Sequence, residues 1–118
     1  MKPPKHVYSQ TMAVNVCTQI DRWQAPTVDT TQVSHVNFQR VHETILSNDG
    51  TQVRTNALVF VDADYSTPAL DYWELQRTSE ANGQPLTVTY DGDLYEVLSV
   101  DCVINQRGAL DHWELTLK

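Results

Sequence analysis

The residues of this chain that could catalyse a reaction or bind a metal are few and widely separated. The four histidines are His6, His35, His42 and His112. None of them has the spacing to a cysteine that zinc sites require. His35 and His42 are seven residues apart and would lie on opposite faces of one strand. We therefore interpret the histidines as surface or hydrogen-bonding residues.

Three aspartates are the remaining candidates for chemistry. Asp62 and Asp64 would lie on one face of an extended segment, and Asp71 follows them. Such carboxylates could bind Ca²⁺ or Mg²⁺, so a small metal-dependent enzyme is one hypothesis. They lack the loop pattern of an EF-hand, however, and aspartates are equally typical of turns. Because the sequence also has no phosphate-binding glycine loop and no nucleophile motif, we predict no enzyme, no metal and no cofactor.

Composition points to one ordinary globular domain. The chain has 118 residues, of which 41% are hydrophobic and 19% are charged, and this length suffices for a packed core without disulfides or metals. Its 8 Lys and Arg against 15 Asp and Glu give a net charge of −7. Binding to a nucleic-acid backbone needs basic residues, so specific DNA binding is not expected. An acidic surface would nevertheless suit a conduit that must let DNA pass.

Cysteine use and hydropathy indicate the compartment. Cys17 and Cys102 both lie in apolar, strand-like runs, which is typical of small core residues in a reducing compartment. A disulfide between them is the alternative. No segment approaches the ~18 apolar residues of a membrane span. Lys2 and Lys5 are not followed by an apolar region, so we predict no signal peptide.

The segment from Gln52 to Ala63 is the centre of the predicted fold. Its middle, Ala57 to Val61, is apolar at every position and ends in β-branched and aromatic residues. A short apolar run between turn signals predicts a strand buried on both faces, with a buried helix as the alternative. Such a strand needs neighbours, and the other segments supply them.

Five further segments are predicted to be strands. Alternation of apolar and polar residues places Met12, Val14 and Val16 on the buried face of one of them and Trp113, Leu115 and Leu117 on the buried face of another. Asp-Gly between alternating runs is the strongest short hairpin signal, because both turn residues need a positive φ. The predicted strands are 11–19, 33–45, 86–90, 93–105 and 110–117, with turns at 47–50, 91–92 and 107–108.

The rest of the chain is predicted to be loops and one short helix. Residues 1–10 form a flexible N-terminal arm, and 21–31 and 77–85 form loops. Thr67-Pro68 resembles a helix N-cap followed by proline at the first helical position, with Leu70, Trp73 and Leu75 on the apolar side. An extended conformation for 69–75 is the alternative.

These elements predict an all-β fold. About six antiparallel strands with at most one short helix suggest a small closed or nearly closed β-barrel over residues 11–118, because closure removes exposed strand edges. Trp73 and Trp113 are expected in its core, whereas Trp23, in a predicted loop, is a candidate for contact with a partner. The heptapeptide at 69–75 recurs at 109–115 with one difference, which we interpret as coincidence because the flanking residues do not match.

Several patches in this order resemble one protein family. They are Asp21-Arg22-Trp23 with Pro26-Thr27, the run Val36 to Val41, Ser47 to Gly50, Asn56 to Asp62 with Ser66 and Pro68, the hairpin Val88 to Val100, and His112 to Leu115. Together they cover roughly residues 12 to 117 and resemble the minor capsid proteins encoded in the head–tail connector region of tailed phages and prophages.

This resemblance implies a structural role in the virion, assembled in the host cytoplasm. Family members are similar to the stopper or adaptor subunits of siphophages, which form a ring below the portal, retain packaged DNA and dock the tail. The implied partners are copies of the same chain, portal or adaptor proteins and tail proteins, with DNA passing nearby and no membrane. A tail terminator or another ring component of the tail tube is the alternative. No catalytic residue carries over from the family.

Segments that become ordered on assembly would contact these partners. We nominate residues 1–10 and 77–85, and within the second segment Arg77, Asn82 and Gly83 as candidate contact residues beside Trp23.

Overall fold

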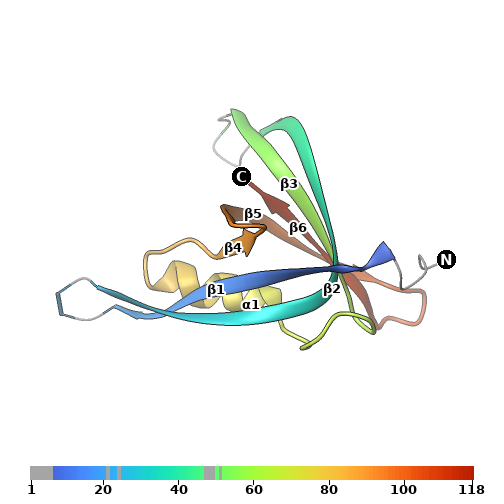
Figure 1. Ribbon diagram of the computed structural model, residues 1–118, viewed down its shortest axis with the longest axis horizontal. Helices are drawn as coiled ribbons and strands as arrows, with labels where there is room; N and C mark the ends of the chain where they lie inside the picture. The colour runs from blue at the N-terminus through green and yellow to red at the C-terminus, as the bar shows by residue number, and fades with distance from the viewer. Residues whose placement is uncertain (1–6, 21, 24, 47–49, 51) are drawn as a thin grey trace.

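The computed structural model describes residues 7–20, 22–23, 25–46, 50 and 52–118. Its strands are β1 (Gln10–Ile20), β2 (Pro26–Leu46), β3 (Gln52–Asp62), β4 (Thr87–Tyr90), β5 (Asp93–Ile104) and β6 (Leu110–Leu117), and its helix is α1 (Tyr72–Ala81). The strands close into an antiparallel barrel in the order β1-β2-β3-β6-β5-β4. Figure 1 shows these strands and the helix. The predicted six-stranded, closed or nearly closed barrel with one short helix is confirmed.

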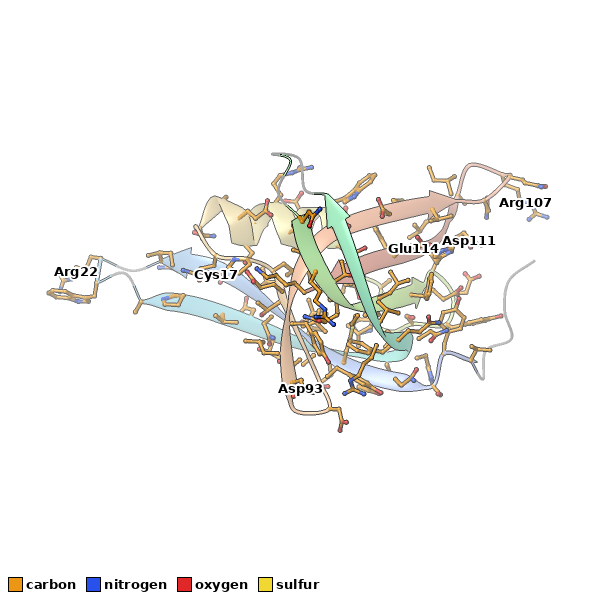
Figure 2. The ribbon with its side chains drawn as sticks, turned by 90° about the horizontal axis from the view of Figure 1, so that it is seen from above. Cys17, Arg22, Asp93, Arg107, Asp111 and Glu114 are labelled. Carbon is orange, nitrogen blue, oxygen red and sulfur yellow. The ribbon has the colours of Figure 1, made fainter. Side chains whose placement is uncertain are left out.

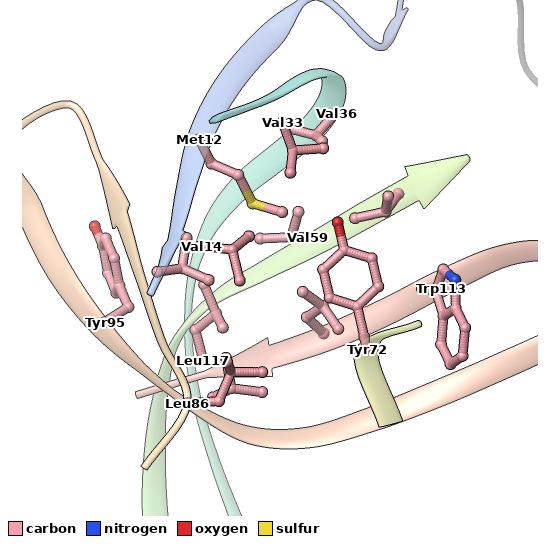
Figure 3. Packing of buried hydrophobic residues seen from close by; sticks show 14 of the residues in the cluster. Met12, Val14, Val33, Val36, Val59, Tyr72, Leu86, Tyr95, Trp113 and Leu117 are labelled. Atoms are coloured by element: carbon pink, nitrogen blue, oxygen red, sulfur yellow. The ribbon is translucent and has the colours of Figure 1, made fainter. Parts of the chain in front are cut away.

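The core fills the inside of this barrel with side chains from every strand and from the helix. The predicted inward faces of β1 and β6 are confirmed, because Met12, Val14, Leu115 and Leu117 are all buried. Figure 3 shows Met12, Val14 and Leu117 packed with other buried residues, among them Val33, Val36, Val59, Tyr72, Leu86 and Trp113. Dense apolar packing of this kind is the main source of stability in a small domain.

The central strand β3 is a strand, but the prediction that both of its faces are buried was wrong. Ala57, Val59 and Val61 point into the barrel and are at most 3% exposed. Leu58 and Phe60, on the outer face, are only half-buried. A barrel wall has one apolar interior, and among the described residues the outer face has only partial cover, such as the His112 ring 5.9 Å from Phe60. The continuous apolar run therefore reflects partial cover on the outer face.

A bulge at His35 changes which residues of β2 point inward. His35 has a φ of 61°, and the pairing of β1 with β2 shifts there, from Thr11 opposite Ser34 to Gln10 opposite Val36. An extra residue in one strand reverses the alternation of its side chains. As a result Val33 and Val36 are both fully buried although they are an odd number of residues apart.

The helix α1 fills the gap left in the barrel wall by the short strand β4. β4 pairs with β1 only at Ala13–Asn15 and with β5 only at Asp93–Glu96. Beyond these points α1 lies between β1 and β5 and contacts both of them. The Trp73 Nε1–H donates to the Val100 carbonyl at 2.8 Å, and the Cys17 N–H donates to Ser79 Oγ at 3.2 Å. The helix thereby satisfies strand edges that a longer β4 would otherwise have paired.

The predicted position of the helix was wrong at both ends. Thr67 is not its N-cap, because its backbone pairs with Ser34 in an isolated bridge. The true N-cap is Asp71, whose side chain accepts a hydrogen bond from the Glu74 N–H at 3.1 Å. The buried residues of α1 are Tyr72 and Ser79. Leu70 and Leu75, from the predicted apolar side, are only partly buried against the core.

Two predicted loops are also corrected. Residues 77–81 continue α1, so the loop after the helix is shorter than the predicted 77–85. Residues 26–31 belong to β2, which is 21 residues long and pairs with β1 as far as Pro26. Within the predicted turn at 47–50 only Gly50 is described, with a φ of 85°. At the N-terminus, Tyr8 is buried and its ring contacts Tyr65 edge-on, while residues 1–6 lie outside the described part.

The hairpin of β4 and β5 forms as predicted around Asp91-Gly92, which have φ angles of 51° and 81°. Its turn packs against β2 just beyond the point where β1 begins. The Phe38 ring stacks on Tyr90 with 4.0 Å between ring centroids, and the Arg40 guanidinium lies 5.2 Å from the Tyr90 ring. Phe38 is buried in the core and Tyr90 packs against it, so these aromatic and cationic contacts hold the end of the hairpin against β2.

Candidate interaction surfaces

A two-stranded arm projects from the barrel, formed by the end of β1 and the start of β2. Figure 1 shows it extending past α1 at one end of the longest axis of the molecule. We call residues 17–28 the hairpin arm. Residues 25–30 are exposed at every position, so this part of β2 rests on no core. Two strands without a covered face are marginal on their own, which indicates that the arm is built to lie against something else.

The tip of the arm carries a large aromatic side chain. Trp23 is 75% exposed, and the Arg22 guanidinium lies 4.9 Å from the centre of its ring. Figure 2 shows Arg22 at the far end of the arm and Cys17 near its base. Val28 adds a half-exposed apolar side chain on the returning strand. Tryptophan and arginine are the residues most enriched at energetically important positions of protein interfaces.

The base of the arm is anchored to the end of α1. Ser79 Oγ accepts a hydrogen bond from the Cys17 N–H and donates one to the Pro85 carbonyl at 3.1 Å. The Asn82 side-chain amide donates to the Cys17 carbonyl at 3.1 Å and to the Thr78 carbonyl at 2.9 Å. Both backbone groups of Cys17 are thus satisfied by helix side chains. These bonds fix the direction in which the arm leaves the barrel.

The four candidate contact residues fall into two groups in the structure. Trp23 lies at the tip of the arm, far along the chain from the others. Arg77 is exposed on α1, where it contacts Glu74 at 3.3 Å. Asn82 caps the helix, and Gly83 follows it with a φ of +75°, in a conformation that suits glycine. The structure therefore gives Asn82 and Gly83 a clear role within the chain itself.

Sequence reasoning missed other exposed apolar side chains. Trp73, which the sequence assigned to the core, is 49% exposed and lies against the edge of the Trp113 ring, with ring centroids 5.5 Å apart. Leu94 and Ile104 are 67% and 58% exposed on β5. The alternation of β5 could have placed Leu94 and Ile104 on one face. Nothing in the sequence separates Trp73, on the outside of a helix, from Trp113, on the inside of a strand.

A shallow pocket of about 110 Å³ lies beside the base of the arm. It is lined by Asn15, Cys17, Pro26, Val28, Gln84, Pro85 and Thr87. Its lining is mainly apolar, and none of these residues is a candidate acid, base or metal ligand apart from the buried thiol of Cys17. The pocket suits an apolar side chain of a partner better than a reactive substrate.

The aspartates considered as metal ligands hold the backbone in place. Asp62 Oδ2 accepts hydrogen bonds from the N–H groups of Asp64 and Tyr65, at 2.8 and 2.9 Å. Asp71 caps α1. Within the described residues, no group of three or more His, Cys, Asp or Glu side chains could hold a metal ion. Turn and cap formation therefore accounts for these carboxylates in the structure.

One histidine lies between two carboxylates on the outer side of the barrel. His112 Nδ1 is 2.6 Å from Asp111 Oδ2, and Nε2 is 3.0 Å from Glu114 Oε1. Partial burial lowers the pKa of His112, but the hydrogen bonds to Asp111 and Glu114 outweigh that effect and raise the pKa above its ordinary value. Figure 2 shows Asp111 and Glu114 on the part of the barrel away from the arm. The cluster is partly exposed and has the character of a surface ion pair.

Cys17 and Cys102 are both free thiols in the structure. Cys17 is buried as expected, whereas Cys102 is only half-buried. Among the described segments, no helix is long and apolar enough to cross a membrane. Compared with known proteins, the chain matches no family model and no curated protein.

Proposed function

We propose that this protein is a structural subunit of a phage neck, of the head-completion or stopper type, which forms a ring below the portal. The observation that carries the proposal is the combination of a closed barrel with a projecting, exposed arm that ends in Trp23. A barrel whose interior is filled by its own side chains offers its outer surfaces for use. The colinear sequence resemblance to minor capsid proteins also supports a role in the neck.

The arrangement of these surfaces supports a ring. In a closed ring each subunit meets its neighbours through two different patches, one on each side. The hairpin arm lies at one end of the long axis, whereas the half-exposed Trp73 lies in the first turn of α1. The two surfaces lie on different elements, and Arg22 accompanies Trp23 whereas Glu74 follows Trp73, so they are different patches, as contacts between successive copies in a ring require.

The charge of the chain supports a position beside DNA. A net charge of −7 repels the phosphate backbone, so DNA would pass without being held. Arg107 lies at the turn between β5 and β6. These strands carry acidic residues, namely Asp101 on β5 and Asp111 and Glu114 on β6. In this proposal the protein works without an active site, and it contributes shape and contacts to the neck.

Deletion of the gene from its phage tests the proposal. We expect heads that package DNA but release it or fail to attach tails, with normal portal and tail assembly. A copy of the gene supplied in trans should restore infectivity, which controls for effects on neighbouring genes. Cryo-electron microscopy of the complemented particle would then place the subunit. Infectious particles of normal yield from the deleted phage would contradict the proposal, and density at the far end of the neck would favour a tail terminator.

A further inference from the structure

We propose that the tip of the hairpin arm of one copy binds the exposed surface around Trp73 of a second copy. This inference rests on the proposed function, which requires copies to meet through two different surfaces. We call Asp71, Trp73, Glu74, Arg77 and Asp101 the helix patch. The contact would place Trp23 of one copy on Trp73 of the next and the Arg22 guanidinium among the carboxylates of the patch.

The helix patch combines one exposed aromatic ring with three acidic residues at the start of α1 and on the neighbouring β5. Trp73 is 49% exposed, and its Nε1–H is already used by the Val100 carbonyl, so the ring is held in a fixed position on the edge of β5. Asp71 is the N-cap of the helix, Glu74 directly follows Trp73 in its first turn, and Asp101 follows Val100 on β5. All three acids are exposed. Arg77 contacts Glu74, which leaves the patch acidic overall.

The arm tip is complementary to this patch in both respects. Trp23 provides a second exposed indole, and Arg22 lies over it. Aromatic rings attract each other in offset or edge-on geometry, as Trp73 and Trp113 do within this chain. A guanidinium beside an aromatic ring matches carboxylates beside an aromatic ring. Important residues on one side of an interface also tend to face important residues on the other.

The geometry requires a second copy, because the arm cannot reach its own patch. The base of the arm is bonded to the last turn of α1 through Cys17 and Asn82. From there β1 continues away from the helix for about 10 Å to Ile20, at about 3.3 Å per residue, and the turn residues Arg22 and Trp23 lie beyond it. α1 runs back in the other direction for about 14 Å to Trp73, at 1.5 Å per residue. Figure 1 shows the first turn of α1 on the barrel side and its last turn toward the arm.

Photo-cross-linking tests this contact. Chains with p-benzoylphenylalanine in place of Trp23 are mixed at high concentration with ¹⁵N-labelled chains that lack the probe, irradiated and analysed by mass spectrometry. Every cross-link to a labelled peptide then joins two copies. We expect labelled cross-links to peptides that contain residues 71–77 and 100–104. Cross-links that are spread over other peptides, confined to the probe's own chain or absent would overturn the proposal.

Charge reversal gives an independent test of the pairing. Arg22→Glu in the probe chain should lower the yield of these cross-links about two- to fivefold, the value of an exposed ion pair. Asp101→Arg in the labelled chain should restore it. Arg107→Glu is the matched control, because Arg107 is also an exposed arginine in a turn but lies at the opposite end of the molecule. A yield that falls equally with Arg107→Glu, or that Asp101→Arg fails to restore, would contradict the contact.

The experiments distinguish a failure of the proposed neck function from a failure of the proposed contact between copies. Cross-links at the helix patch together with normal particles from the deleted phage would refute the neck function and leave the contact in place. A neck defect without these cross-links would refute the contact and leave the function in place.

Discussion

Replacement of Ser79 by alanine tests how the helix holds the base of the hairpin arm. Ser79 is fully buried, and its hydroxyl joins three parts of the chain. It accepts a hydrogen bond from the Cys17 N–H at 3.2 Å and donates to the Pro85 carbonyl at 3.1 Å. Alanine has nearly the same shape but can make neither bond. The substitution therefore isolates the hydrogen bonds from the packing.

The expected loss of stability can be worked out from the two partners. Cys17 is buried, so its N–H would be left without a partner at a cost of about 1–3 kcal/mol. Pro85 is exposed, so its carbonyl can turn to water and loses at most about 1 kcal/mol. Alanine is the better helix former by about 0.5 kcal/mol, which offsets part of this. We expect a net loss of about 2 kcal/mol in the free energy of unfolding.

Urea denaturation measures this difference, with Thr78→Ala as the control. Thr78 precedes Ser79 on the same helix, is half-buried, and should change stability by less than about 0.5 kcal/mol. For a chain of 118 residues, a loss of 2 kcal/mol lowers the melting temperature by about 8 °C. Amide hydrogen exchange should also be faster at Cys17 in the Ser79→Ala protein. If Ser79→Ala matches Thr78→Ala in stability and the Cys17 amide stays protected, the anchoring role assigned to Ser79 is wrong.

Three further changes have defined outcomes. Tyr72→Phe should raise the free energy of unfolding by about 1–2 kcal/mol, because the buried Tyr72 hydroxyl has no hydrogen-bond partner among the described residues; a loss in the same urea titration would show that the hydroxyl is satisfied. His112→Asn should lower stability most at pH values below the ordinary histidine pKa of 6.5, because only imidazolium can donate to both Asp111 and Glu114. The loss should become smaller as the pH rises through the raised pKa of His112 in the folded state. Melting curves across that pH range check this prediction, and a difference in melting temperature that does not change with pH would refute it. Gly92→Ala should lower stability by about 1 kcal/mol through backbone strain alone, since its φ is +81° and a Cβ would meet nothing within 4 Å; thermal melting measures the loss, and an unchanged melting temperature would argue against the left-handed turn.

Elements with a strong local signal could be predicted from the sequence. Asp91-Gly92 sets the β4–β5 hairpin, because the turn residues demand that geometry wherever the hairpin lies. The alternation from Leu110 to Leu117 gave both the limits and the inward face of β6. In each case a local rule and the final fold agree. The closed barrel then follows, because this number of strands leaves few other ways to satisfy their edges.

The repeated heptapeptide shows where local rules stop. Residues 69–75 lead into α1, whereas the nearly identical residues 109–115 lie mainly in β6. The first copy has an aspartate cap followed by residues that favour a helix up to Ala81. The second copy lies between β3 and β5, whose edges require a strand there. The segment itself is compatible with both states, and its neighbours in space decide between them.

The candidate surface was only partly predictable. The sequence singled out Trp23 but gave its surroundings as a loop, because residues 26–31 have no alternation of apolar and polar residues. The exposed segment becomes a strand through its pairing with β1. Trp73 was assigned to the core because core packing is the commoner role of tryptophan in an apolar segment. Its exposure follows from the position of α1 at the edge of the barrel, which depends on the shortness of β4.

The great length of β2 has a mechanical consequence. One continuous backbone runs from Pro26 beside the arm tip, through the barrel wall, to Leu46 at the other hairpin. A load applied to the arm by a neighbouring subunit would therefore travel along covalent bonds to the far side of the molecule. The left-handed residue His35 lies near the middle of that path and offers a hinge at which the strand can bend. A displacement at one subunit contact of an assembled ring would thus be transmitted to the next subunit contact.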